Sequence, residues 1–237
     1  MPAFRHEQLL AMTDGMNSVA LQAIKHLKGK NEIESLSFMN RVAFSSICIS
    51  AFDHNINALE SNSHDPILVA QELATKELIK RIQRTKYWKS LPIPSNFHLA
   101  NALKEQETAL KQIINEKSEG AGEAKILLNE FLRARDDNGN PMSETELFHM
   151  CMQFMAAGHE TTGAALQWVL YFLATHPDVQ ERVLKEANEI LGDRENISFD
   201  DVKKMTYFEA VFNESMRVRA PIPVMVRSAA SSIVLGD

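Results

Sequence analysis

The chain has 237 residues, enough for one large domain or for part of a larger one. Its hydrophobic fraction of 45% and charged fraction of 24% are ordinary for a soluble globular protein. The net charge of −6 argues against a broad nucleic-acid-binding face, which usually shows as a basic excess, and we expect no nucleic-acid partner. The two cysteines, Cys48 and Cys151, both lie in apolar helical contexts, which predicts buried thiols and not a disulfide framework.

Apolar residues at helical spacing, together with helix start and stop signals, predict a chain made almost entirely of helices. The expected helices span about 7–27, 35–52, 66–84, 97–117, 124–133, 143–175, 177–191, 199–205 and 207–219. Ser35 or Ser37 is expected to cap the second of them. After Pro221 and Pro223 the residues become β-branched and alternating, which predicts one or two short strands before Gly236. The expected fold class is therefore mainly α, with about ten helices and a short C-terminal β segment.

The helix expected over 143–175 dominates the chain. Ser143 and Glu146 form a capping-box pattern at its start, and a proline after residue 176 marks its end. Between 151 and 174 it is apolar nearly all round, which is typical of a helix buried on every side. Its middle, residues 156–165, combines small side chains with polar ones and one carboxylate, Glu160. These polar residues argue against a lipid-facing span, and the small ones indicate that something lies beside the helix.

The centre of this helix admits two interpretations. An H-E-x-x-H zinc site is excluded because position 163, where the second histidine would stand, is Gly163. Glu160 and Thr161 beside Gly158 could mark a helix kink, with threonine hydroxyls bonded to carbonyls one turn back. Alternatively, an opened hydrogen-bond ladder lies beside a ligand or cofactor, where a buried acid and an alcohol relay protons.

A second charged feature lies near the end of the chain. Glu214 and Arg217 are three residues apart on one face of the helix expected over 207–219. Such pairs are usually solvated. The preceding residues, 207–212, are too apolar for a solvent-facing helix, so we expect this pair to be buried and structural.

Together these residues resemble the cytochrome P450 superfamily of haem-thiolate monooxygenases. Residues 157–162, AGHETT, match the central-helix signature [AG]-G-x-[DE]-T-[TS] of that family, and Glu214 with Arg217 matches its E-x-x-R helix. The order of the elements agrees as well. The resemblance covers essentially the whole chain and implies a single incomplete cytochrome P450 domain over 1–237, with the central helix at about 143–175 and the E-x-x-R helix at about 207–219.

The resemblance implies roles for residues of the central helix. Glu160 and Thr161 would be catalytic and would deliver protons to iron-bound dioxygen. Ala157, Gly158 and Thr162 would form or flank the groove that accepts the oxygen.

It also implies roles outside that motif. Arg227 would be directed at a haem propionate and so bind the cofactor. Glu214 and Arg217 would be structural. The substrate pocket would be lined by Phe154, Ile222, Val224 and Met225.

By the same resemblance the cofactor is haem b, and the partners are dioxygen, an apolar small-molecule substrate and a reductase that donates electrons. The resemblance leaves localisation open, since full-length relatives are often anchored in the endoplasmic reticulum membrane or cytoplasmic, and the sequence shows no anchor.

The family's iron is held by a cysteine in an F-x-x-G-x-x-x-C-x-G loop. This sequence has no match to that loop, and neither Cys48 nor Cys151 has the matching context. We therefore expect an internal fragment that has no metal ligand, binds haem unstably and is inactive by itself. One alternative is a non-catalytic helical fragment that binds an apolar ligand or partner. Another is a truncated gene model with no folded product.

Overall fold

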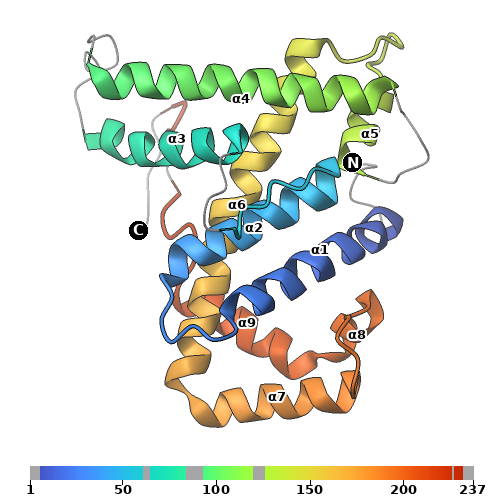
Figure 1. The fold of residues 1–237 in the computed structure, drawn as a ribbon, viewed down its shortest axis with the longest axis vertical. Coiled ribbons are helices and arrows are strands. Elements are labelled where there is room, and N and C mark those ends of the chain that lie inside the picture. Colours follow the sequence, from blue (N-terminus) through green and yellow to red (C-terminus); the bar gives the residue numbers. More distant parts are fainter. Residues whose placement is uncertain (1–5, 61–64, 84–92, 120–125, 226, 232–237) are drawn as a thin grey trace.

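The computed structural model describes residues 6–60, 65–83, 93–119, 126–225 and 227–231 (Figure 1). Within these ranges the chain is mainly α, as predicted, and forms nine helices. They are α1 (His6–Leu27), α2 (Ser35–Phe52), α3 (Pro66–Gln83), α4 (Pro94–Glu119), α5 (Leu127–Arg133), α6 (Glu144–Thr175), α7 (Pro177–Leu191), α8 (Phe199–Lys204) and α9 (Thr206–Val218).

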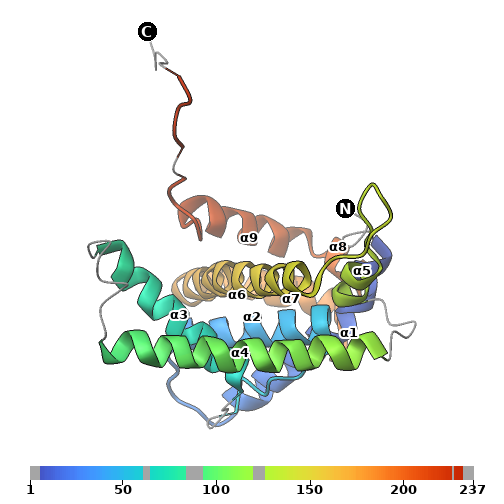
Figure 2. The ribbon, with the colours of Figure 1, turned by 90° about the horizontal axis from the view of Figure 1, so that it is seen from above.

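The long helix α6 runs through the middle of the molecule, and the other helices are arranged around it (Figure 1). The helices α1 and α2 lie on one side of α6, and α9 lies on the opposite side (Figure 2). At one end of α6, α3 and α4 pack against each other, while α7 and α8 lie at the other end. The largest interhelical packing is that of α2 on α6, and it positions the site described below.

Local signals at both ends explain where α6 begins and stops. The backbone amide of Ser143 donates to Glu146 Oε2 at 2.8 Å, and the amide of Glu146 donates to Ser143 Oγ at 3.3 Å, so the predicted capping box is confirmed. At the other end the amide of His176 donates to the Phe172 carbonyl before Pro177 opens α7. The 32 residues of α6 correspond to about 48 Å of uninterrupted helix.

The expectation that α6 is buried on every side is wrong. Its buried residues form a stripe with a four-residue spacing in the first half of the helix, and the complete set is Leu147, Cys151, Met155, His159, Gly163, Ala165 and Val169. Elsewhere on the helix Leu170 and Tyr171 are exposed. The apolar composition of a helix does not by itself decide how many of its faces are covered, because that depends on which elements pack against it.

Several helix ends differ from the sequence-based expectation. Glu34, and not Ser35 or Ser37, caps α2, because its carboxylate accepts from the amides of Leu36 and Ser37. Pro94 starts α4 three residues early, since its fixed φ suits the first helical turn. The helix α5 begins at Leu127 because Ile126 is extended.

The expected C-terminal β segment is absent from the residues that can be described. Residues 219–225 and 227–231 contain no strand, and 232–237 lie outside the described part of the chain. The described segment after α9 extends away from the helical body (Figure 2). Among the described helices, none is long and apolar enough to cross a membrane.

Candidate functional site

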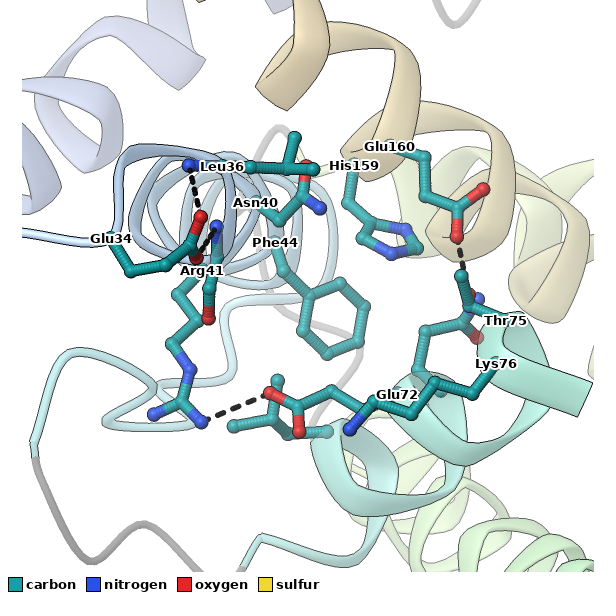
Figure 3. Close-up of a pocket in the computed structure, with 13 residues that line it drawn as sticks. Glu34, Leu36, Asn40, Arg41, Phe44, Glu72, Thr75, Lys76, His159 and Glu160 are labelled. Carbon is teal, nitrogen blue, oxygen red and sulfur yellow. Dashed lines mark hydrogen bonds and ion pairs between the residues drawn. The ribbon is translucent and has the colours of Figure 1, made fainter. Parts of the chain in front are cut away.

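Glu160 and Thr161, the adjacent acid and alcohol at the centre of α6, point in different directions. The Thr75 hydroxyl of α3 donates a hydrogen bond to Glu160 Oε1 (Figure 3). The Thr161 hydroxyl instead donates to the Ala157 carbonyl, one turn back along α6, at 2.8 Å. Successive helical residues are rotated by about 100°, so two neighbours cannot share one direction. The structure therefore places the two predicted proton-handling groups on different sides of the helix.

A cavity of about 210 Å³ lies where α2, α3 and α6 meet, and Glu160 lines it (Figure 3). On the α2 and α3 side, Arg41 and Glu72 form an ion pair at 3.0 Å. His159 lines the cavity on the α6 side: its Nδ1 donates to the Met155 carbonyl at 3.0 Å, and its ring lies 5.0 Å from that of Phe44. The remaining lining residues are Glu34, Leu36, Ser37, Asn40, Leu68, Gln71, Thr75 and Lys76.

The small residues in the middle of α6 lie in two different environments, one against α2 and one exposed on the surface. Gly158 lies against α2, where an added Cβ would be 3.2 Å from Ile47 Cγ1. Ala157 and Thr162 are exposed, and Thr161 is partly buried. The space that the sequence predicted beside the helix is thus filled by α2 at Gly158, while Ala157 and Thr162 face outward. Whether these residues accept oxygen stays a prediction.

The helix-kink interpretation predicted threonine hydroxyls bonded to carbonyls one turn back, and Thr161 makes this bond to the carbonyl of Ala157. The other interpretation, an opened ladder, has no counterpart in the secondary structure, because α6 is continuous from Glu144 to Thr175.

The structure does not bring the four expected substrate-pocket residues together. Phe154 packs beside the main hydrophobic core, with its ring 5.2 Å from that of Phe131 in α5. Ile222, Val224 and Met225 lie on the segment after α9 and are 60%, 72% and 69% exposed. None of the four lines the cavity beside Glu160.

Arg227, the expected cofactor-binding residue, is also exposed, on the segment after α9. Its expected role towards a haem propionate stays a prediction.

The expectation that Glu214 and Arg217 are buried is wrong. They form a two-point ion pair, with Nε and one guanidinium nitrogen each 2.7 Å from a carboxylate oxygen. The Arg217 hydrogen bond lowers the pKa of Glu214. The side chains of Glu214 and Arg217 are 60% and 71% exposed, because no described element covers this face of α9. The helix α9 packs on α6 and α7, but none of the residues 207–212 before the pair is fully buried.

Sequence reasoning missed Thr75, Arg41 and Glu72. They lie on α2 and α3, and Thr75 is 85 residues from Glu160 along the chain. No motif or spacing in the sequence marks them. Only the packing of α2 and α3 around α6 brings them to the same cavity.

The thiol groups of this chain do not fit the iron site of a haem-thiolate protein. The side chains of Cys48 and Cys151 are fully buried, on α2 and α6, and burial raises the pKa of both thiols, that of Cys151 to about 12. Iron ligation needs the thiolate form and an open approach. In the described part of the chain there is also no group of three or more His, Cys, Asp or Glu residues that could hold a metal ion.

Comparison with known proteins shows what the chain is similar to. It is 29% identical over 232 residues to "Cytochrome P450 4F6" of Rattus norvegicus, a match that covers 89% of this chain and 42% of that protein. It is 25% identical over 241 residues to "Self-sufficient cytochrome P450 monooxygenase CYP505E3" of Phanerodontia chrysosporium, covering 100% of this chain and 23% of that one. For "Bifunctional cytochrome P450/NADPH--P450 reductase 2" of Bacillus subtilis (strain 168) the identity is 24%, with 100% and 23% covered.

The chain therefore spans less than half the length of these relatives. The family model "Cytochrome P450" matches residues 1–237, so the chain belongs to the cytochrome P450 family.

Proposed function

We propose that the protein containing this chain is a haem-dependent monooxygenase that inserts one atom of dioxygen into an apolar organic substrate, with electrons from a reductase. The family match over the whole chain supports this, as do the relatives named as a monooxygenase and as a P450 fused to a reductase. The observation that carries the proposal is the placement of Glu160 in the middle of α6, where it lines a cavity, next to Thr161 in the sequence.

The roles proposed for these two residues follow from their surroundings. A carboxylate that lines a cavity is placed to act as a general acid or base towards a molecule there, and the Glu160 side chain is partly buried at this cavity. The Thr161 hydroxyl donates its hydrogen bond to the Ala157 carbonyl, and its oxygen can still accept hydrogen bonds. We assign Glu160 as the acid–base group at the cavity and Thr161 as a separate hydroxyl that assists on another side of α6. When bound, haem supplies the activation of dioxygen.

Substitutions in the full-length protein test this assignment. Glu160→Gln keeps the size of the side chain but removes its acid–base function, and Thr161→Ala removes the hydroxyl. Each is expected to lower kcat about a hundredfold, the usual contribution of a positioned acid or base, with little change in KM. The matched control is Glu189→Gln, an exposed glutamate of α7, which should leave turnover unchanged. Normal kcat in both site variants would contradict the proposed roles.

We further propose that the 237-residue chain by itself does not form a thiolate-ligated haem. The argument rests on its only two thiols, which are buried in helices and held in the protonated form. The measurement is the carbon monoxide difference spectrum of the reduced chain after reconstitution with haem. The expected result is no red-shifted Soret band. A band of the kind that thiolate ligation gives would refute this statement.

A second candidate function is the binding of an apolar small molecule without catalysis. A cavity of about 390 Å³ between α6, α7 and α9 favours it. Its walls are mainly apolar and include Phe172, Val179, Tyr207, Val211 and Val218. This candidate predicts that the chain binds a fluorescent apolar probe and takes up no haem. Turnover that rises in step with added haem in the full-length protein would exclude it.

A further inference from the structure

Thr75 of α3 is placed to control the orientation of Glu160. Its hydroxyl donates to Glu160 Oε1, and the two side chains meet at the wall of the cavity (Figure 3). Within the described residues, Glu160 makes no ion pair, and the Thr75 hydroxyl is the one side chain that donates a hydrogen bond to its carboxylate. A hydrogen bond to a charged acceptor is stronger than one between neutral groups. A single donor can therefore fix the orientation of the Glu160 carboxylate.

The surroundings of Thr75 restrict where that hydroxyl can lie. Along α3, Glu72 is three residues earlier and so lies on the same face of the helix. Glu72 accepts from Arg41 of α2 at 3.0 Å, and Arg41 in turn donates to the carbonyl of Ala58. Elsewhere α3 packs mainly on α4. Two polar links, one to α2 and one to α6, therefore fix this face of α3 over the cavity.

We propose that Thr75 is a positioning residue for Glu160: it holds the carboxylate at the cavity wall, on the α3 side of α6. The inference rests on the function proposed above, because it concerns how the acid of that site is oriented. Thr75 does not itself touch substrate or cofactor. Its effect on turnover passes through Glu160.

Two substitutions separate positioning from mere support of the fold. Thr75→Val keeps the shape of the side chain and removes the donor, and Thr75→Ser keeps the donor. The control is Thr108→Val on α4, whose hydroxyl donates to the Lys104 carbonyl on an exposed face. In the full-length protein Thr75→Val is expected to lower kcat about tenfold at nearly constant KM, the loss of one hydrogen bond to a charged group. Thr75→Ser and Thr108→Val should both retain normal kcat.

A second readout is independent of turnover. In protein labelled with 13C at the glutamate carboxylates, the infrared difference between wild type and Glu160→Gln isolates the carboxylate band of residue 160. Thr75→Val is expected to shift this band, Thr75→Ser to restore it, and Thr108→Val to leave it in place. An unshifted band in Thr75→Val overturns the inference, as does a kcat loss that Thr75→Ser fails to restore. Absence of any monooxygenase turnover in the wild type refutes the proposed function instead, and it leaves the infrared result to decide on Thr75.

Discussion

Asn40 of α2 lies directly against Gly163 of α6. A Cβ added at position 163 would approach the Cα of Asn40 to 2.8 Å, closer than real Cβ contacts allow. Asn40 Oδ1 is buried in this contact and has no hydrogen-bond partner within the described residues. Because the obstruction includes backbone, a side chain at 163 would have to push α2 away from α6. Gly163 therefore sets the closest approach of the two helices that flank the cavity.

Gly163→Ala is expected to lower the free energy of unfolding, because overpacking usually costs about 1–3 kcal/mol. The gain in helix propensity, about 1 kcal/mol, offsets part of this cost, so the net loss of stability is up to about 2 kcal/mol. Urea denaturation measures the difference. Gly158→Ala is the matched control, because an added Cβ there meets only the side chain of Ile47, which can move aside. It should stay within about 1 kcal/mol of wild type. Equal stability of the two variants would contradict the close-approach argument.

Asp201 of α8 gives the fold a defined acid sensitivity. Hydrogen bonds from Arg194, at 2.8 and 3.1 Å, and from Ser198 lower the pKa of Asp201 well below its ordinary range. A carboxyl whose pKa is depressed by folding contributes its full stabilisation above the unfolded-state pKa, about 4, and loses it as the pH falls further. The free energy of unfolding of wild type should therefore exceed that of Asp201→Asn by the largest amount at about pH 7. This difference should become smaller towards about pH 3.

The urea midpoints of wild type and Asp201→Asn, measured across this range, test the prediction. Asp200→Asn is the control on the same helix. The Asp200 carboxylate is exposed and forms an ion pair with Lys203 at 3.0 Å, an arrangement that contributes little to stability. A gap between wild type and Asp201→Asn that widens towards low pH would contradict the sign of the argument.

The parts of the fold that the sequence predicted well are those with local causes. Pro177 and Gly192 delimit α7, and Ser143 delimits α6, because the cap residues and the ring of proline act within a few residues of where they stand. The fold class follows from the same periodic patterns, and family membership followed from two short motifs in the right order.

The burial of Cys48 and Cys151 was predicted correctly, whereas which charge pairs and helix faces are covered could not be predicted. The apolar stretch 207–212 suggested that Glu214 and Arg217 were buried, but a charge pair is covered only where another element packs over it. Likewise, the small residues of α6 indicated space, and only the structure shows that α2 fills it at Gly158 and Gly163. The bond between Thr75 and Glu160 depends on α3 lying beside α6, which no local pattern encodes.

Glu186 of α7 caps the start of α9 from outside that helix. Its carboxylate accepts from the amides of Tyr207 at 2.7 Å and Phe208 at 2.9 Å, whereas Met205 at the N-cap position makes no side-chain cap. Glu186→Ala leaves these amides without that acceptor and removes a negative charge from the positive end of the helix dipole. The free energy of unfolding should fall by about 0.5–2 kcal/mol, as for loss of an N-cap.

Amide hydrogen exchange locates this effect. In Glu186→Ala the amides of the first turn of α9 should exchange faster than in wild type, and urea denaturation should show the loss of stability. Glu189→Ala removes a glutamate from the same helix α7, whose carboxylate makes a long, exposed contact with Lys185 at 3.9 Å. It should change neither measurement. Unaltered exchange at Tyr207 and Phe208 in Glu186→Ala would show that the cap contributes nothing.

The two cysteines are expected to be unreactive in the folded chain. Cys48 and Cys151 have no exposed side-chain surface, and burial raises the pKa of both thiols, so the reactive thiolate is scarce as well as inaccessible. Iodoacetamide at neutral pH should add to neither in native buffer and to both in concentrated urea, and mass spectrometry counts the adducts. Val→Cys at position 202, an exposed residue of α8, provides the reactive control. Rapid labelling of Cys48 or Cys151 under native conditions would mean that α2 and α6 separate in solution, and the packing at Gly163 would then be transient.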